Sequence, residues 1–177
     1  MSDLHIDLLV ADAVCAPDYQ AALLDQADRA RVSAAPALAM RTDWQVSRFL
    51  KQQAKAPVLS LSHSHGTALL AAGAYALPLG VDIEFHRDPW PSNLAERYFA
   101  DGEKALLKGE DPVHAGTTFF RLWSRKEAYY KCAGGAFLGG ALSLDLRPHR
   151  VGDVMLWDLQ GPFAAEGHSL GLAAMAI

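Results

Sequence analysis

The chain has 177 residues, 51% of them hydrophobic, and a formal net charge of −4. This apolar content is enough to bury a core in one domain or in two small fused halves, and it argues against a disordered chain. The acidic balance argues against a nucleic-acid-binding protein, which needs a basic stripe to neutralise phosphates. Two cysteines imply no disulfide framework and favour a reducing, cytoplasmic setting.

Neither export nor membrane insertion is expected. The opening MSDLHIDLLV lacks the basic n-region of a secretion signal. The longest apolar stretch, 68–81, is broken by Gly73, Pro78 and Gly80 and is shorter than the roughly 18 residues that span a bilayer. We therefore expect a soluble protein.

The first half of the chain reads as a strand, a pair of helices and two more strands. Apolar alternation from Leu4 to Val10 predicts the first strand. Pro17 and Asp18 open a helix that is expected to run to about Ala34, and a second helix follows Pro36. The remaining strands are predicted at 58–62 and 67–76, joined by a tight SHSHG turn.

The second half repeats this order. We expect a strand over 80–85, short helices with Ser92 and Asp101 as N-caps, and a longer helix over 114–133 that Gly134 and Gly135 end. Three strands are predicted to follow, over 141–146, 154–159 and 169–176. The repeated order indicates an α+β fold with two similar halves, 1–79 and 80–177.

Two acidic residues share one face of the predicted strand GVDIE, 80–84. Because alternate residues of a strand point the same way, Asp82 and Glu84 project together. Paired carboxylates suit a hard cation such as Mg²⁺, which takes one or two of them and fills its remaining positions with water and substrate phosphates. A solvated acidic strand face is the alternative.

The long helix carries a second group of candidates in FFRLWSRKEAYYKCAGG. Steps of four residues place Trp123, Glu127 and Lys131 on one helix face. Glu127 could bind the metal or accept a proton, and Lys131 could neutralise a phosphate. A Glu with a Lys four residues later is also the ordinary stabilising pair of an exposed helix.

A third candidate segment is LSLSHSHG, 59–66. Its serine hydroxyls, backbone amides and imidazoles could hold phosphate oxygens, although a plain polar turn is also consistent with it. The i, i+2 spacing of His63 and His65 suggests zinc only weakly, because no third His or Cys lies near in sequence.

Taken together, these segments resemble the 4′-phosphopantetheinyl transferase superfamily, in particular its surfactin-type branch. The resemblance rests on SHS, GVDIE and FF-x-LW-x-x-KEA-x-x-K in this order, and it spans about Arg29 to Gly140. It implies two similar α+β halves with small antiparallel sheets that hold coenzyme A between them. It also implies transfer of the phosphopantetheine arm to a serine of an acyl or peptidyl carrier protein, with release of 3′,5′-ADP.

The resemblance assigns roles in the second half. It makes Asp82, Glu84 and Glu127 the Mg²⁺ ligands, and Asp82 is thereby also part of the coenzyme A site. Glu127 would be the general base, with Glu84 as second candidate, and Lys131 would contact the phosphate. Lys126 would line the pantetheine side.

For the nucleotide, the resemblance points to the first half. His63 would bind the 3′-phosphate with Ser62 nearby, while Arg41 would lie beside the adenine and Arg29 would contact phosphate. The family's Gly-Lys-Pro loop is missing, and only Lys55 stands in that region. The family implies a monomer that meets its carrier transiently.

An acidic carrier needs a basic or apolar landing surface on a chain of negative charge. Arg121, Arg125 and Lys126, beside Phe137 and Leu138, are the candidates. Two other functions stay open: a metal-dependent phosphodiesterase or pyrophosphatase, and a catalytically silent module that binds coenzyme A or a carrier protein.

Overall fold

The computed structural model describes residues 5–74, 77–135, 142–160 and 167–175. The chain divides into two compact units, Met1–Ala76 and Leu77–Ile177. None of the helices in these described ranges is long and apolar enough to cross a membrane.

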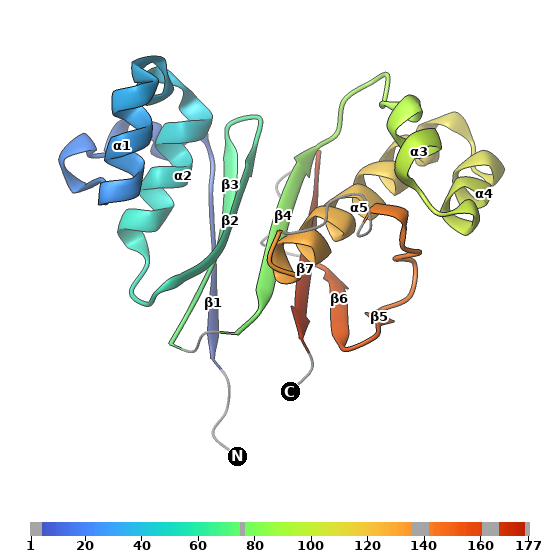
Figure 1. Ribbon diagram of the computed structural model, residues 1–177. Helices are drawn as coiled ribbons and strands as arrows, with labels where there is room; N and C mark the ends of the chain where they lie inside the picture. Colours follow the sequence, from blue (N-terminus) through green and yellow to red (C-terminus); the bar gives the residue numbers. More distant parts are fainter. Residues whose placement is uncertain (1–4, 75–76, 136–141, 161–166, 176–177) are drawn as a thin grey trace. The chain divides into compact units, whose positions relative to one another are not determined.

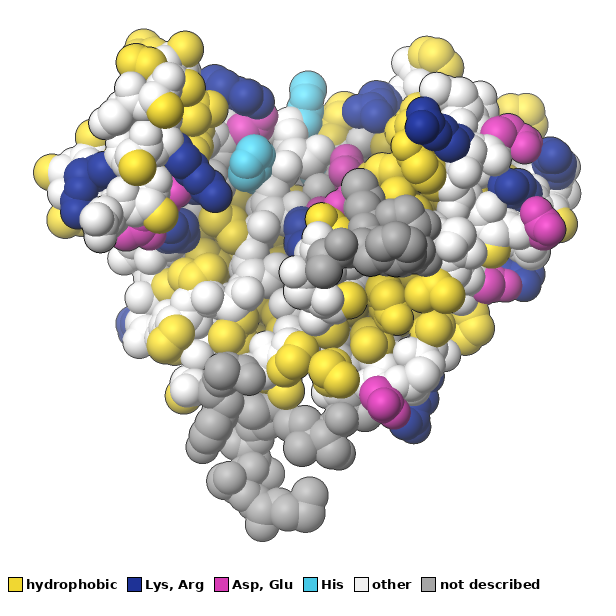
Figure 2. Space-filling view, in the orientation of Figure 1, with side chains coloured by type: hydrophobic (Ala, Val, Ile, Leu, Met, Phe, Trp, Pro, Cys, Tyr) yellow, Lys and Arg dark blue, Asp and Glu magenta, His cyan; other side chains and the backbone are white. Residues whose placement is uncertain are grey.

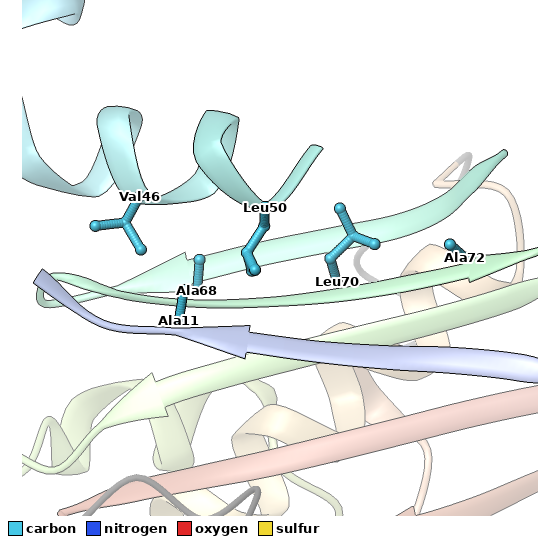
Figure 3. Close-up of a cluster of buried hydrophobic side chains, with 6 residues drawn as sticks. All are labelled: Ala11, Val46, Leu50, Ala68, Leu70 and Ala72. Carbon is cyan, nitrogen blue, oxygen red and sulfur yellow. The ribbon is translucent and has the colours of Figure 1, made fainter. Parts of the chain in front are cut away.

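The first unit is a three-stranded antiparallel sheet with helices on one face (Figure 1). Its strands are β1 (Ile6–Ala11), β2 (Val58–Ser64) and β3 (Thr67–Gly73), in the order β1-β3-β2. Helix α2 (Thr42–Gln53) packs on this sheet through Val46 and Leu50, which meet alanines and Leu70 of the strands (Figure 3). The core of the unit therefore lies between α2 and the sheet.

The prediction of a single helix over 17–34 is wrong. The structure has two short 3₁₀ segments, η1 (Ala13–Asp18) and η2 (Ala21–Leu23), before α1 (Gln26–Ala34), and a third, η3 (Pro36–Met40), precedes α2. The helix begins anew at residue 26 because Asp25 is its N-cap. The carboxylate of Asp25 accepts a hydrogen bond from the backbone amide of Asp28, with 2.8 Å between Oδ1 and N.

The turn between β2 and β3 is shorter than SHSHG. Ser64 still pairs with Thr67, so only His65 and Gly66 form the loop, with φ of 50° and 78°. Two successive residues with positive φ are typical of a type I′ hairpin turn. The position of His65 is thereby explained, since histidine enters this region more readily than most side chains.

The second unit repeats the strand, helices and hairpin arrangement on a four-stranded antiparallel sheet. Its order is β4-β7-β6-β5, and the last strand pairs with the first, as β3 pairs with β1 in the first unit. The predicted α+β fold with two similar halves is thus confirmed. The elements are β4 (Leu79–Phe85), α3 (Ser92–Tyr98), α4 (Asp101–Gly109), α5 (Pro112–Cys132), β5 (Arg150–Val151), β6 (Val154–Asp158) and β7 (His168–Met175).

Three local predictions fail in this unit. No strand occupies 142–146, the described part of the expected strand, and Leu142 and Ser143 are helical. Ser92 and Asp101 are the first residues of their helices, and the residues before them hold the cap positions. At α4 the carboxylate of Glu103 reaches back to the amide of Ala100 instead, at 2.9 Å.

Positive side chains are not gathered into a stripe on the face drawn in Figure 2. Lys and Arg stand there in separate groups with Asp and Glu among them, as far as the described residues go. Any anionic partner on this face therefore meets small local clusters of charge.

Candidate active site

The long helix α5 lies against sheet β4-β7 with its backbone almost touching the strands. A Cβ at Gly80 would overlap the carbonyl oxygen of Ala128 and lie 2.7 Å from the amide nitrogen of Cys132. A Cβ at Gly171, on β7, would lie 2.6 Å from the carbonyl oxygen of Ser124. Gly80 thus lets α5 approach β4, the strand that carries the acidic pair, and Gly171 lets it approach the neighbouring β7.

We expect Gly80→Ala to lower the free energy of unfolding by about 1–3 kcal/mol or more, because the new methyl group meets backbone atoms that cannot move aside. Urea denaturation measures the change. Gly109→Ala is the matched control: nothing lies within 4 Å of its Cβ, so stability should stay equal or rise by up to about 1 kcal/mol. Equal stability of wild type and Gly80→Ala would contradict the close packing of α5 on β4.

Two carboxylates of β4 and one of α5 lie near one another at this contact. Asp82 is 3% exposed, and Glu84 follows on the same strand face. The ammonium of Lys131, one helical turn after Glu127, is 2.8 Å from an oxygen of Asp82 and 3.0 Å from the carbonyl oxygen of Val81. The predicted group of residues 82, 84, 127 and 131 is therefore brought to one place.

Burial and mutual repulsion raise the pKa values of two of these carboxyls. Burial raises the pKa of Glu84 to about 7, with the neighbouring charges of Asp82 and Glu127 adding to it. Burial, followed by the charge of Asp82, also raises the pKa of Glu127, while Lys131 opposes this. The carboxyls are thus electrostatically coupled, and a cation among them would relieve the repulsion.

Trp123 contacts this acidic group as well as the core. A hydrogen bond from its side chain favours the ionised form of Glu84. Its ring stacks on Phe119 and Phe99, with centroids 5.9 and 6.3 Å apart. Trp123 therefore packs in the aromatic core, as its aromatic character suggests, and its side chain also holds the carboxylate of Glu84 in place.

The acidic group can bind a metal only with help from water or from a ligand. Among the described residues, no group of three or more His, Cys, Asp or Glu side chains converges as a ready-made metal cage. Mg²⁺ does not require such a cage, because it commonly takes one or two carboxylates and completes its shell with water and phosphate oxygens. Coupled carboxyls of raised pKa at one place are consistent with that mode of binding.

Lys126 does not reach toward a ligand in this structure. Its side chain is fully buried, and its ammonium lies 2.8 Å from a carboxylate oxygen of Glu103 and 2.7 and 2.6 Å from the carbonyl oxygens of Leu142 and Leu144. Three acceptors engage all three donor hydrogens. The structure therefore does not support the predicted contact of Lys126 with the pantetheine arm.

The predicted landing surface for a carrier also changes. Arg125 is buried, and its guanidinium makes two hydrogen bonds to Asp158, at 2.6 and 2.7 Å. Phe137 and Leu138 lie outside the described residues. Arg121 remains exposed on α5 and is the part of the predicted surface that can meet a partner.

In the first unit, Ser62 and His63 point to opposite faces of the sheet. His63 pairs with Ala68, which belongs to the core under α2, whereas Ser62 pairs with Leu69. The strand geometry therefore does not predict that both side chains contact one phosphate. His63 is exposed, and Ser62 is largely buried.

Arg41 lies near the β2–β3 turn. One oxygen of Asp43 is 3.7 Å from its guanidinium, and the other accepts a hydrogen bond from the amide of Gly66. Arg29 lies on α1 and donates to the carbonyl of Leu24, and no contact in the described ranges joins it to this turn. Of the predicted nucleotide-side residues, Arg41 and His63 thus share one end of the unit.

Two residues that shape the site, Gly171 and Arg87, were not predicted from the sequence. Gly171 sits opposite Asp82 in the sheet but lies 89 positions later, so no local motif marks it. Arg87 follows the acidic strand, lowers the pKa of Glu84 by its charge, and stands over the ring of Phe120 at 5.8 Å. Its place three residues after Glu84 is the only signal that the sequence offers.

Comparison with known proteins places the second unit in a family. The sequence profile of the 4′-phosphopantetheinyl transferase superfamily matches residues 78–170, more than half of the chain and nearly all of the unit that carries the acidic group. The chain belongs to the 4′-phosphopantetheinyl transferase superfamily, as the sequence motifs predict.

Several curated relatives are similar over part of their length. The 4′-phosphopantetheinyl transferase HetI of Nostoc sp. is 37% identical over 44% of this chain and 32% of its own. AcpT of Salmonella typhi is 30% identical over 60% of this chain and 66% of its own, and Sfp of Bacillus subtilis is 30% identical over 55% and 42%. The matches thus span between a third and two thirds of these relatives.

Proposed function

We propose that this protein transfers the 4′-phosphopantetheine arm of coenzyme A to a serine of an acidic carrier protein and releases 3′,5′-ADP. The observation that carries the proposal is the group of coupled carboxyls from β4 and α5 beside Lys131, inside the part of the chain that matches the family. The relatives named above are phosphopantetheinyl transferases.

Asp82, Glu84 and Glu127 would hold Mg²⁺ with the help of phosphate oxygens and water. When bound, the ion would screen the charge of the pyrophosphate and of the leaving oxygen. The mutual repulsion of the three carboxyls supports this assignment, because it falls when a divalent cation is shared among them.

The transfer needs a proton acceptor for the carrier serine. Its hydroxyl oxygen forms the new bond to the β-phosphorus, the bond from that phosphorus to the leaving phosphate oxygen breaks, and the hydroxyl proton goes to Glu127. A raised pKa suits a carboxylate to this role near neutral pH, and Glu84 is the second candidate for the same reason. Lys131 would offset negative charge on the phosphates.

His63 and Arg41 would contact the nucleotide end of coenzyme A from the first unit, and Ser62 and Arg29 are weaker candidates. A guanidinium and an imidazole both donate to phosphate oxygens. The shared location of Arg41 and His63 near the β2–β3 turn supports their assignment.

The main rival is a metal-dependent phosphodiesterase, which would use the same carboxyls to activate water. The two functions differ in what they require: a transferase releases 3′,5′-ADP only when an apo-carrier with its serine is present. Chromatography of coenzyme A incubated with protein and Mg²⁺ separates them. Release of 3′,5′-ADP without carrier, at the rate seen with carrier, would favour the rival.

Chelation of divalent metal should reduce transfer to background, and added Mg²⁺ should restore it, because the carboxyls alone repel the pyrophosphate. Melting temperature gives a second readout. Coenzyme A at about 100 times its Kd would stabilise the fold by about 2.7 kcal/mol, and only when Mg²⁺ is present. Undiminished transfer in excess chelator would contradict the assignment of a metal.

Arg121→Glu should raise the KM for an acidic carrier about fivefold at low salt and leave the KM for coenzyme A unchanged, because one exposed charge contributes about 1 kcal/mol to such an encounter. The effect should shrink as salt rises. Arg97→Glu on α3 is the control, since Arg97 is likewise exposed and has a tyrosine ring beside it. Equal KM values for Arg121→Glu and wild type would remove Arg121 from the landing surface.

A further inference from the structure

The proposed chemistry makes no use of one fully buried ion pair in the second unit. The carboxylate of Glu103, on α4, and the ammonium of Lys126, on α5, are 2.8 Å apart, and neither side chain is exposed to solvent. Replacing such a pair by apolar residues is often neutral or stabilising, because the cost of burying two charges offsets much of their attraction. Stability alone is therefore a weak reason for the pair, and its contacts indicate a second role.

Hydrogen bonds from this pair hold three segments together. One oxygen of Glu103 accepts from the amide of Ala100 and the other from the amide of Leu146, both at 2.9 Å. Lys126 donates to two carbonyls of the segment 142–146. Hydrogen bonds depend on direction as well as distance, whereas apolar contacts tolerate small shifts. The pair thus fixes the start of α4, the segment 142–146 and the middle of α5 relative to one another.

The same pair is linked to both glutamates of the acidic group. Lys126 directly precedes Glu127, so the helix backbone carries any displacement of one to the other. The ammonium of Lys126 also lies 5.0 Å from the centre of the Phe99 ring, which stacks on Trp123 at 6.3 Å. The side chain of Trp123 in turn hydrogen-bonds Glu84. A contiguous set of contacts therefore joins the ion pair to Glu127 and Glu84.

We propose that Glu103 is a positioning residue of the transferase, which acts through Lys126 to hold Glu127 and Glu84 where the metal and the carrier serine are bound. The inference rests on the proposed function. Glu103 touches neither the substrates nor the reacting atoms in this role, and it fixes the groups that do. A misplacement of about 1 Å can lower a catalysed rate by about 100-fold, so the loss of this directional tie should be visible in kcat.

Glu103→Gln tests the role, because glutamine has the size of glutamate and lacks its charge. We expect kcat to fall by about tenfold or more, at a temperature at which circular dichroism shows the variant folded, while the KM for the carrier stays within about threefold of wild type. Leu146→Ala is the matched control. It removes buried apolar contacts at the same place and is also destabilising, but it keeps the amide that donates to Glu103, so its kcat should stay within about threefold of wild type. Glu103→Asp, which retracts the charge from Lys126, is measured in the same way and replaces the glutamine variant if that one does not fold.

A second readout does not need transfer. The indole N–H resonance of Trp123, assigned with Trp123→Phe, reports on its contact with Glu84, and we expect it to shift in Glu103→Gln while that of Trp44 in the first unit does not. If the wild-type protein transfers nothing, the proposed function fails, and the positioning role is then judged by this resonance alone. Equal kcat values of Glu103→Gln and Leu146→Ala, or an unchanged Trp123 resonance, would overturn the proposal.

Discussion

Glu127→Gln should lower the rate of phosphopantetheine transfer by about two to four orders of magnitude, the usual contribution of a general base. The glutamine has the size of the glutamate, so α5 should still pack on β4. It cannot accept the serine proton, and it brings no negative charge to a metal. Burial and the charge of Asp82 raise the pKa of Glu127, as a proton acceptor near neutral pH requires.

The measurement is kcat with saturating coenzyme A and carrier, and circular dichroism shows whether the variant folds. Glu96→Gln on α3 is the matched control, because that glutamate is exposed and forms a surface ion pair with Lys108. It should retain full activity. A Glu127→Gln enzyme with kcat within threefold of wild type would exclude residue 127 as the base and leave Glu84 as the candidate.

Lys126→Met should lower the free energy of unfolding by about 3–5 kcal/mol, which makes it the most destabilising of the substitutions considered. The change removes the cation 2.8 Å from Glu103 and leaves that fully buried carboxylate without its counter-charge. The carbonyls of Leu142 and Leu144 lose their donor at the same time. Methionine fills much of the space, so the loss reports mainly on charge and hydrogen bonds.

Urea denaturation of Lys126→Met beside Lys108→Met tests this role. Lys108 is 68% exposed and forms a surface ion pair, which typically contributes less than about 1 kcal/mol. If both variants lose equally little, Lys126 is not a structural residue, and the ligand contact predicted from the sequence regains support. A large loss for Lys126→Met alone supports the structural role.

The sequence was sufficient to predict which site residues share a face where the pattern is local. Alternation in GVDIE placed Asp82 and Glu84 on one strand face, and steps of four residues placed Glu127 and Lys131 on one helix face. Two units with matching strand order follow from the repeated order of elements. The prediction that the strand residues and the helix residues come together rested on the family resemblance, because spacing in the sequence cannot predict it.

The same sequence could not tell which side of α5 is buried beneath α4 and β6. Arg121, Arg125 and Lys126 look alike as a basic run, yet Arg125 pairs with the half-buried Asp158 and Lys126 with the fully buried Glu103. Those partners lie 33 and 23 positions away, so their pairing depends on the tertiary fold. The sequence also did not predict the break in the helix before residue 26. The stretch is compatible with a continuous helix, but the Asp25 side chain caps a new helix there, and this local hydrogen bond competes with continuation of the helix.

The most direct test of the account is the intact mass of an apo-carrier protein after incubation with this protein, coenzyme A and Mg²⁺. We predict that the carrier gains the mass of one phosphopantetheine arm, and that a carrier with alanine in place of its modified serine gains none. An unchanged mass for acyl and peptidyl carriers alike, from a protein that is folded and binds coenzyme A, would contradict the proposed transfer.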